Sequence, residues 1–397
     1  SIVVAEIINS KVEDNPLIPS AFRAEYLNSD KSSFTNNLEY IDHDGDADLY
    51  LSVFVNFTAF ESGVFNDPAH AKSNIMLLNN GDLTFTDITT RSNTAGKQNS
   101  FLSVFTDLDN DGWQDLVVSQ NTGEVEIFRN NKNLTFTAIP TNSGYGFWMG
   151  LAVGDIDNDG DQDLFFSNVG NSIPDFLTKG DIRDDQKHNL EWLLLRNDGN
   201  FQFTDITAEF GIVGEGFAWG GIFEDINLDG RLDLLVAQNY IKWPIHKLFK
   251  LSGRSYLQTA TGGLFKHAEE LGIENEFYGQ SPISADLDND GKPDLIWLNM
   301  NGPVRAFLNR SNNDFFQVVV PESARLFGTR AHIVTSSGNS YTKEVLTSTG
   351  MLTDQSPNLV FGLKGSEKVE KVVIVYPDGT KQVITEPNSQ FSLSIAH

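Results

Sequence analysis

The sequence contains no cysteine, so its fold owes nothing to disulfide bonds. It also contains no uninterrupted apolar run near the roughly 18 residues that a membrane-spanning helix needs, and we expect no membrane insertion. Basic residues are scarce, with 28 Lys and Arg against 54 Asp and Glu and a formal net charge of -26. Because nucleic acids and anionic membrane surfaces attract basic proteins, neither is an expected partner.

Familiar catalytic motifs are missing as well. The seven histidines are scattered, and the sequence has no HExxH motif, no nucleophile elbow and no glycine-rich phosphate loop. The run K-W-P-I-H-K places His246 beside Lys247 in an expected loop, where the pair would suit acid–base chemistry; the competing interpretation is a solvated loop histidine. His188 is the third candidate catalytic residue.

One acidic pattern occurs five times. It reads D-L-D-N-D-G-W-Q-D-L from Asp107, D-I-D-N-D-G-D-Q-D-L from Asp155, D-I-N-L-D-G-R-L-D-L from Asp225 and D-L-D-N-D-G-K-P-D-L from Asp286, with a variant, Y-I-D-H-D-G-D-A-D-L, from Tyr40. Oxygen-bearing side chains stand at positions one, three, five and nine, and glycine at position six permits a sharp turn. The pattern predicts four to five structural Ca²⁺ ions.

The predicted ligands follow from these positions, with a backbone carbonyl expected at position seven. They are Asp107, Asp109, Asp111, Trp113 and Asp115; Asp155, Asp157, Asp159, Asp161 and Asp163; Asp225, Asn227, Asp229, Arg231 and Asp233; Asp286, Asp288, Asp290, Lys292 and Asp294; and, in the variant, Asp42, Asp44 and Asp48. Because Tyr40 replaces the first carboxylate of the variant, that loop holds either a weaker ion or none.

Two other interpretations of the loops fit less well. A helix-flanked calcium loop closes with glutamate at position twelve, but that position is apolar here: Val118, Phe166, Val236 and Trp297. Metal-free Asp-Gly hairpin turns explain one such loop easily but explain poorly a pattern that repeats with the same ligand spacing. Each loop leads into a β-rich apolar stretch, which indicates a strand.

Hairpins recur between the loops, starting at Ile75, Val125 and Trp192, with degenerate copies near Lys247 and Val304. One repeat is therefore strand, metal loop, strand and hairpin, which makes a four-stranded antiparallel sheet. Radial repetition of such sheets is a β-propeller, so we predict an all-β fold with five countable blades.

At this point the chain resembles a known family. The phrase G-x-x-x-G-x-A-x-G-D-x-D-N-D-G at 146–160 is similar to FG-GAP/VCBS repeats, as in integrin α-subunits and, more closely, cartilage acidic protein and its bacterial relatives. G-T-R-A-H-I-V from Gly328, L-V-F-G-L from Leu359 and V-E-K-V-V-I-V-Y-P-D-G from Val369 resemble an ASPIC/UnbV domain. The resemblance implies a calcium-loaded propeller, commonly seven-bladed, over residues 1–311, followed by a small β-sandwich-like domain over residues 312–397. It also implies export and adhesion or matrix-like roles, although some such propellers are enzymes.

The loop alignment also predicts a ligand site. Five residues stand six positions before the loops, where the innermost strands begin: Phe34, Phe101, Met149, Trp219 and Gln280. They are expected to surround the tunnel mouth opposite the metal loops, with Trp148 and Tyr278 beside them. Such a mouth suits an apolar or sugar-like ligand, although these aromatic side chains also suit packing between blades.

Together these features predict a secreted or periplasmic, calcium-stabilised protein that binds a carbohydrate, a glycoconjugate or a protein surface at the tunnel mouth. The alternative is a non-redox enzyme, such as a lyase or cyclase, that acts on a small lipophilic substrate there. The first residues, S-I-V-V-A-E-I-I-N-S, lack a basic leader and a cleavage site, so a signal peptide is presumed to have been removed.

Overall fold

The computed structural model describes residues 32–56, 71–82, 84–96, 98–170, 181–238, 251–260, 263–300, 302–321, 326–346, 348–388 and 390–392. Nearly all regular structure in this part of the chain is β-strand, and the predicted all-β class is confirmed. None of its helices is long and apolar enough to cross a membrane.

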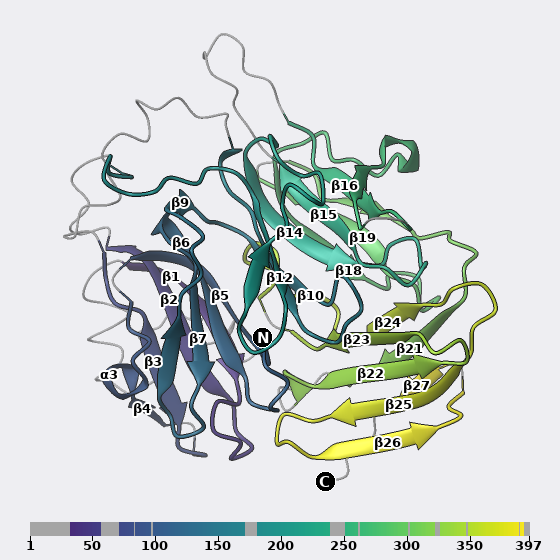
Figure 1. The fold of residues 1–397 in the computed structure, drawn as a ribbon, viewed down its shortest axis with the longest axis horizontal. Helices are drawn as coiled ribbons and strands as arrows, with labels where there is room; N and C mark the ends of the chain where they lie inside the picture. Colours follow the sequence, from purple (N-terminus) through teal and green to yellow (C-terminus); the bar gives the residue numbers. More distant parts are fainter. Residues whose placement is uncertain are drawn as a thin grey trace.

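Five antiparallel sheets, here called blades one to five, follow one another along the chain (Figure 1). Blade one contains β1 (Ser32–Glu39), β2 (Asp48–Asn56), β3 (Ile75–Asn79) and β4 (Phe85–Asp87). Blade two contains β5 (Asn99–Thr106), β6 (Asp115–Gly123), β7 (Glu126–Asn130) and β8 (Phe136–Ile139), and β9 (Gly146–Phe147) also pairs with β6. The short helix α3 (Thr89–Ser92) joins the two blades.

Blade three contains β10 (Leu151–Gly154), β11 (Asp163–Phe166), β12 (Leu193–Asn197) and β13 (Phe203–Asp205). Blade four contains β14 (Ala218–Glu224), β15 (Asp233–Gln238), β16 (Arg254–Gln258) and β17 (Phe265–His267), followed by the 3-10 helix η5 (Glu269–Leu271). Blade five has three strands, β18 (Gly279–Ala285), β19 (Asp294–Asn299) and β20 (Arg305–Phe307).

In every blade the acidic loop joins the first strand to the second, so the predicted order of strand, acidic loop and strand is confirmed. We number these loops one to five with their blades. Position ten begins the strand's apolar run, as at Leu116 and Leu164, and both residues are fully buried. The hairpin of blade four starts at Arg254 rather than near Lys247, which lies outside the described residues.

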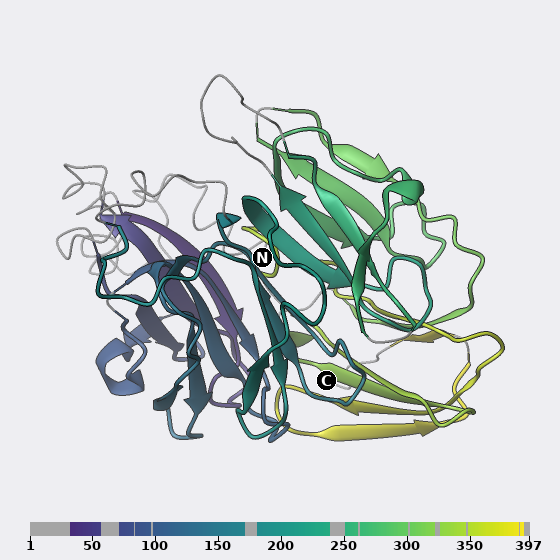
Figure 2. The same cartoon turned by 45° about the horizontal axis from the view of Figure 1, so that its top comes forward.

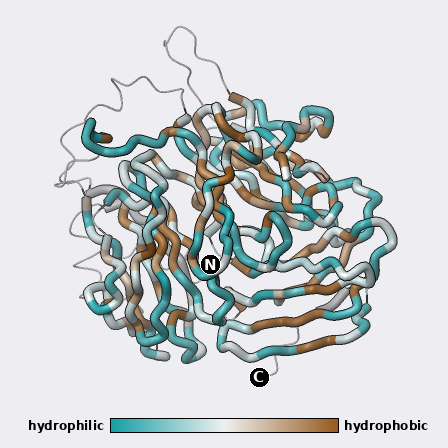
Figure 3. The backbone as a smooth tube through the Cα atoms, in the orientation of Figure 1, coloured by the Kyte–Doolittle hydropathy of each residue, from teal (hydrophilic) through white to brown (hydrophobic). Residues whose placement is uncertain are grey.

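The blades form an arc in which the first strands face inward: β5 packs beside β1, β14 beside β10, and β18 beside β14. Figures 1 and 2 show this sequence from the purple blade one to the green blade five. Hydrophobic segments coincide with the strands, and hydrophilic segments gather in the loops at their ends (Figure 3). The cores lie mostly between neighbouring blades; Leu102 and Val117 of blade two, for example, share a cluster with Phe166 of blade three.

Two further sheets lie beside this arc. One contains β21 (Phe315–Val319), β24 (Leu359–Gly362) and β27 (Gln390–Ser392); the other contains β22 (Arg330–Thr335), β23 (Ser340–Glu344), β25 (Val369–Val375) and β26 (Lys381–Thr385). Phe316 and Phe361 of the first sheet share one hydrophobic core with Ile333 and Val372 of the second. These two sheets, called here the C-terminal sheets, therefore pack face to face in a sandwich-like arrangement.

A segment of the C-terminal region, residues 349–356, enters the centre of the arc; we call it the central segment. Gly350 forms a β-bridge with Leu151 of the innermost strand β10. Met351 donates its backbone N–H to Ser281 of β18. Close approach requires glycine, because a Cβ on Gly150 would lie 2.8 Å from the carbonyl oxygen of Gly350. The sequence predicted an open tunnel, whereas in the structure this segment lies along three innermost strands.

Candidate metal loops and ligand-binding mouth

The position-one aspartate shapes each of loops two to five. In loop three, Asp155 accepts backbone hydrogen bonds from Asp159 at 3.0 Å and from Gly160 at 3.0 Å. Gly160 has a φ of 99°, a conformation that a residue with a Cβ adopts only with strain. Asp107, Asp225 and Asp286 make the same pair of bonds in their loops. The repeated sequence therefore folds into one repeated turn that directs several carboxylates inward.

The position-nine aspartate links each loop to two strands. Asp163 is fully buried; its Oδ2 accepts the N–H of Ile156 at 2.8 Å, and its Oδ1 accepts the N–H of Asn197, at the end of β12, at 2.8 Å. Four equivalent residues accept the same two kinds of bond: Asp48, Asp115, Asp233 and Asp294. A residue predicted from its metal-ligand spacing thus also holds the blade together.

Carboxylates converge in three of the loops. In each, one oxygen from positions one, three and nine lies within 4.8 Å of the other two: Asp107, Asp109 and Asp115; Asp155, Asp157 and Asp163; Asp286, Asp288 and Asp294. Asp109 Oδ1 is buried and accepts no hydrogen bond from the described residues. Arg129 lies 3.1 Å from the other oxygen of Asp109, and the all-oxygen donor set that remains fits Ca²⁺ or another hard ion.

Burial and mutual repulsion raise the pKa values of two carboxyls of loop three, Asp155 and Asp163, in the metal-free chain. Burial raises the pKa of Asp155 to about 7, with further contributions from Asp159 and Asp157. Burial likewise raises the pKa of Asp163 to about 8, although its two backbone hydrogen bonds oppose the shift. A divalent cation in the loop would offset both the lost hydration and the repulsion.

Loops one and four depart from this pattern. Loop four has Asn227 at position three, and the amide oxygen of Asn227 accepts the N–H of Asp229 at 3.0 Å. In loop one, Tyr40 is buried at position one, while Asp48 keeps both of its backbone hydrogen bonds. The side chains at positions three and five, Asp42 and Asp44, remain in the turn. The turn of loop one therefore forms without its first carboxylate.

Loops one to four are also joined to the following blade. Asn197 of blade three donates its side-chain N–H to the carbonyl of Leu108 in loop two at 2.8 Å. Three equivalent contacts join Asn130 to Ile41, Gln258 to Ile156, and Asn309 to Ile226. We call these four amides the latch residues, because each connects position two of one loop to the next blade.

The C-terminal sheets dock on loops two and four. Arg330 of β22 donates to the carbonyl of Asp107 and to the side chain of Asn110. Arg330 also lies 3.2 Å from Glu344, whose side chain is fully buried. On the other side, Lys343 of β23 lies 2.8 Å from Glu224, which directly precedes loop four. None of these interdomain contacts was predicted.

At the other end of the innermost strands, aromatic side chains gather in what we call the mouth. Phe101 and Trp219 have ring centroids 6.1 Å apart, Phe217 lies 5.2 Å from Trp219, and Phe54 lies 4.6 Å from Phe101. Met149 is buried among them. Of the predicted mouth residues, Phe101, Met149 and Trp219 do come together, and Phe54 was missed because it lies on the second strand of its blade.

Other predicted mouth residues are placed differently. Trp148 is fully buried between blades two and three, where its indole N–H donates to Gly123 at 3.0 Å, so its prediction as a ligand contact is wrong. Gln280 donates to the carbonyl of Met351 at 3.4 Å, and Tyr278 is 48% exposed. Phe34 lies on β1, but its side chain is outside the described part of the structure.

The structure describes one of the three candidate catalytic residues. His188 lies 2.9 Å from the carbonyl of Arg183 on an exposed turn and pairs through its backbone with Tyr145. His246 and Lys247 lie outside the described residues.

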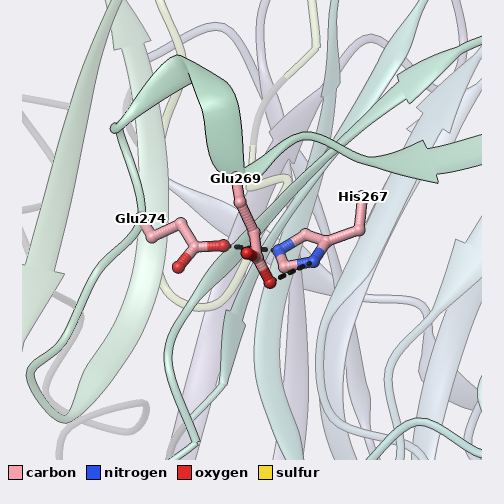
Figure 4. A group of neighbouring side chains, drawn as sticks. All are labelled: His267, Glu269 and Glu274. Carbon is pink, nitrogen blue, oxygen red and sulfur yellow. Dashed lines mark ion pairs between the residues drawn. The ribbon is translucent and has the colours of Figure 1, made fainter.

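A second kind of cluster was not predicted. Figure 4 shows the carboxylates of Glu269 and Glu274 directed at the ring of His267, at the end of blade four. The imidazole Nε2 lies 2.5 Å from Glu274, and Nδ1 lies 3.5 Å from Glu269. None of the three was predicted as a site residue, although they lie within eight consecutive positions: His267 ends β17, Glu269 begins η5 and Glu274 follows it.

Comparison with known proteins gives two family matches. A model described as an FG-GAP-like repeat matches residues 107–166, which span loops two and three, and the ASPIC and UnbV model matches residues 321–397. No curated protein sequence matches the chain significantly.

Several solved structures show a distant likeness. A lectin from Agrocybe aegerita that recognises non-reducing terminal N-acetylglucosamine is 14% identical, with a TM-score of 0.42 over 92% of this chain and 83% of the lectin. The V. cholerae biofilm matrix protein Bap1 is 12% identical, with a TM-score of 0.36 over 89% of this chain and 59% of Bap1. TM-scores this low establish neither a shared fold nor a shared ligand. The family matches do establish that the chain carries an FG-GAP-like repeat and an ASPIC and UnbV domain, as its motifs predicted.

Proposed function

We propose that this chain is an exported, calcium-stabilised β-propeller-like protein that binds a carbohydrate, a glycoconjugate or a protein surface at its aromatic mouth. The observation that carries the proposal is the group formed by Phe101, Phe217 and Trp219, all partly exposed, at the end of the innermost strands away from the metal loops. Aromatic faces of this kind bind apolar patches and sugar rings well.

The floor of the mouth supports binding rather than catalysis. Trp219 belongs to the same strand as Gly220, where a Cβ would lie 2.9 Å from the Cβ of Met351 in the central segment. The central segment therefore packs against the strand that carries Trp219. His188, the one described catalytic candidate, is held in an exposed turn by backbone contacts. Partly exposed aromatic rings fit a surface or a sugar better than a substrate that must be shielded from water.

Calcium would act structurally in this protein. Loops two, three and five each hold three converging carboxylates, and the loops are dispersed along the arc. Ions in separate blades cannot act on one substrate, but each would fix a turn on which the position-nine aspartate depends, and in loops two and three a latch residue depends on it as well. Millimolar calcium outside the cytosol would keep such open loops filled, which supports an exported location.

A binding screen with a matched variant tests the proposal. Calcium-loaded protein would be applied to a glycan array and to immobilised extracellular proteins, together with Trp219→Ala and Phe85→Ala. Phe85 is a matched control because it is a partly buried aromatic residue on the outermost strand β4. We expect Trp219→Ala alone to lose the captured ligand. Equal binding by Trp219→Ala and the parent protein would refute the mouth as the binding site.

A further inference from the structure

A second kind of candidate metal site lies at the outermost strand of blade four and the segment that follows it. It consists of His267 at the end of β17, Glu269 at the start of η5 and Glu274 beyond it, and we call it the histidine cluster. Figure 4 shows both carboxylates directed at the imidazole ring. One ligand atom from each residue lies within 4.8 Å of the other two. Unlike the acidic loops, this cluster offers a nitrogen donor together with its oxygens.

The imidazole and Glu274 are close to each other but are not hydrogen-bonded. Nε2 of His267 lies 2.5 Å from Oε1 of Glu274, yet neither atom has a hydrogen-bond partner among the described residues. The oxygen therefore lies beside the direction of an Nε2–H bond, because a well-aligned contact at this distance would be a hydrogen bond. A carboxylate that shares a metal ion with an imidazole lies to the side in this way, since the ion occupies the line of the nitrogen lone pair. Two donor atoms that face each other without bonding indicate a third partner.

Glu269 completes the set from the solvent side. Its carboxylate lies 3.5 Å from Nδ1 of His267, and its side chain is 78% exposed and free to rotate around the ring edge. The ring itself is held in place, because His267 pairs with Tyr256 of β16 and the two ring centroids lie 5.6 Å apart. The cluster thus combines a fixed imidazole with an adaptable carboxylate.

An ion can reach the cluster from the surface. The side chains of His267 and Glu274 are 26% and 27% exposed. Nε2 and Oε1 cover each other, and an ion that binds both must separate them, since two ligands of one Zn²⁺ lie about 3 Å apart. Rotation of the partly exposed Glu274 side chain opens that gap without a change in the backbone.

The backbone that carries Glu274 is fixed by blade five. Arg305 of β20 donates a hydrogen bond to the carbonyl of Glu274 at 3.0 Å. Trp297 of β19 donates its indole N–H to the carbonyl of Ile273 at 2.7 Å. His267, in contrast, belongs to blade four. An ion held by both His267 and Glu274 would therefore tie the two blades together.

The donor set favours a transition-metal ion over calcium. Ca²⁺ takes oxygen ligands, whereas Zn²⁺ accepts imidazole nitrogen and carboxylate oxygen in one site and leaves a fourth position for water. Arg254, whose charge also acts on Glu274, is already paired with Glu215 at 2.7 Å. Two carboxylates and a neutral imidazole carry two negative charges, which one divalent ion neutralises.

We propose that His267, Glu269 and Glu274 bind a divalent transition-metal ion such as Zn²⁺, and that the bound ion ties the end of blade four to the segment that leads into blade five. The site differs from the acidic loops in its donor chemistry. The proposal depends neither on ligand binding at the mouth nor on calcium in the loops.

Calorimetric titration with zinc tests the proposal. The protein would be freed of transition metals and kept in excess calcium, which fills the oxygen-only loops, and then titrated with ZnCl₂. We expect one saturable site whose affinity falls about tenfold or more in His267→Gln and in Glu274→Gln. His332→Gln is the matched control, because His332 is also half-buried but contacts the Thr342 hydroxyl at 2.9 Å, and it should bind zinc as the parent does. No saturable binding, or weak binding that survives in His267→Gln, overturns the proposal.

Two further measurements separate metal binding from folding. Because Glu269 is exposed, Glu269→Gln should keep the parent's melting temperature without zinc and still bind zinc about tenfold more weakly. Unchanged affinity in this variant would leave too few ligands for a specific site and would overturn the proposal. A crystal soaked in zinc with excess calcium should show an anomalous peak about 2.1 Å from a ring nitrogen of His267. Peaks at the acidic loops alone would mean that the cluster is only an ion pair.

Discussion

Asp163 and Asp157 belong to the same candidate metal loop, but replacing each by asparagine should have different consequences. Asp163 is buried and accepts the N–H groups of Ile156 and Asn197, both at 2.8 Å. Asp157 is exposed and contributes one oxygen to the converging carboxylates. We therefore expect Asp157→Asn to matter only when calcium is present, and Asp163→Asn to matter in both conditions.

The magnitudes follow from the contacts. Asparagine at 163 can accept one of the two backbone bonds, but its amide NH₂ then faces the other N–H. Losing one buried hydrogen bond of this kind lowers the free energy of unfolding by about 2 kcal/mol without calcium. With calcium, either variant also loses linked binding energy, which is about 2.7 kcal/mol when free calcium is 100 times the dissociation constant. Without calcium, Asp157→Asn should be neutral or slightly stabilising, because it removes repulsion between Asp157 and Asp159.

The assay is hydrogen exchange read by mass spectrometry, because a local change in blade three is better resolved there than in a global melt. The peptides that contain Ile156 and Asn197 would be followed at pH 7.5 in calcium and in chelator. Asp163→Asn should accelerate exchange in both conditions, and Asp157→Asn only in calcium. Unchanged exchange of Asp163→Asn in chelator would refute the structural role assigned to the position-nine aspartates.

Three further predictions concern the whole molecule. Chelation should lower the melting temperature, and an unchanged value would contradict a structural role for calcium. Without calcium, the free energy of unfolding should fall as pH rises from about 4 to about 8. Burial raises the folded-state pKa values of Asp155 (to about 7) and Asp163 (to about 8) above the ordinary 3.8, so the folded state holds more protons than the unfolded state in this range. Denaturant unfolding across the range measures the sign, and a rising free energy of unfolding would contradict the prediction. Arg330→Ala should lower the free energy of unfolding by about 3–5 kcal/mol, because it leaves Glu344 buried without its charged partner. Replacing the exposed Lys371 by alanine should change it by no more than about 0.5 kcal/mol. Urea unfolding measures both variants, and equal values would argue against a buried pair.

Much of the blade could be predicted because its determinants are local. Ligand spacing, the position-six glycine and the following apolar residues all lie within ten consecutive positions, and each of the five loops has the predicted strands on either side. The second role of position nine was hidden. Asp163 has the identity that calcium requires, and nothing in its spacing shows that Asn197, far along the chain, donates to it.

The long-range contacts were not predictable from one sequence. Trp148 and Trp219 occupy nearly the same register before their loops, yet Trp148 packs between blades and Trp219 reaches the mouth. Trp148 stands seven residues before Asp155, whereas Trp219 stands six before Asp225, and in an extended chain one position reverses the face to which a side chain points. Gly350 offers no such local sign: it reads as an ordinary turn residue, and its role in the centre of the arc depends on strand β10, about half the chain away.

The latch residues give the arc a direction. Loops one to four are each bonded by an amide from the following blade, as Asn197 of blade three bonds Leu108 of loop two. Damage to loop two should therefore also loosen blade three, through Asn197. Loop two is also bonded by Arg330 of β22, so the same damage should loosen the C-terminal sheets. An ion bound in loop two would accordingly stabilise its own blade, the next blade and the docked C-terminal region together. This is a physical reason for the proposed binding protein to have its metal sites far from its mouth.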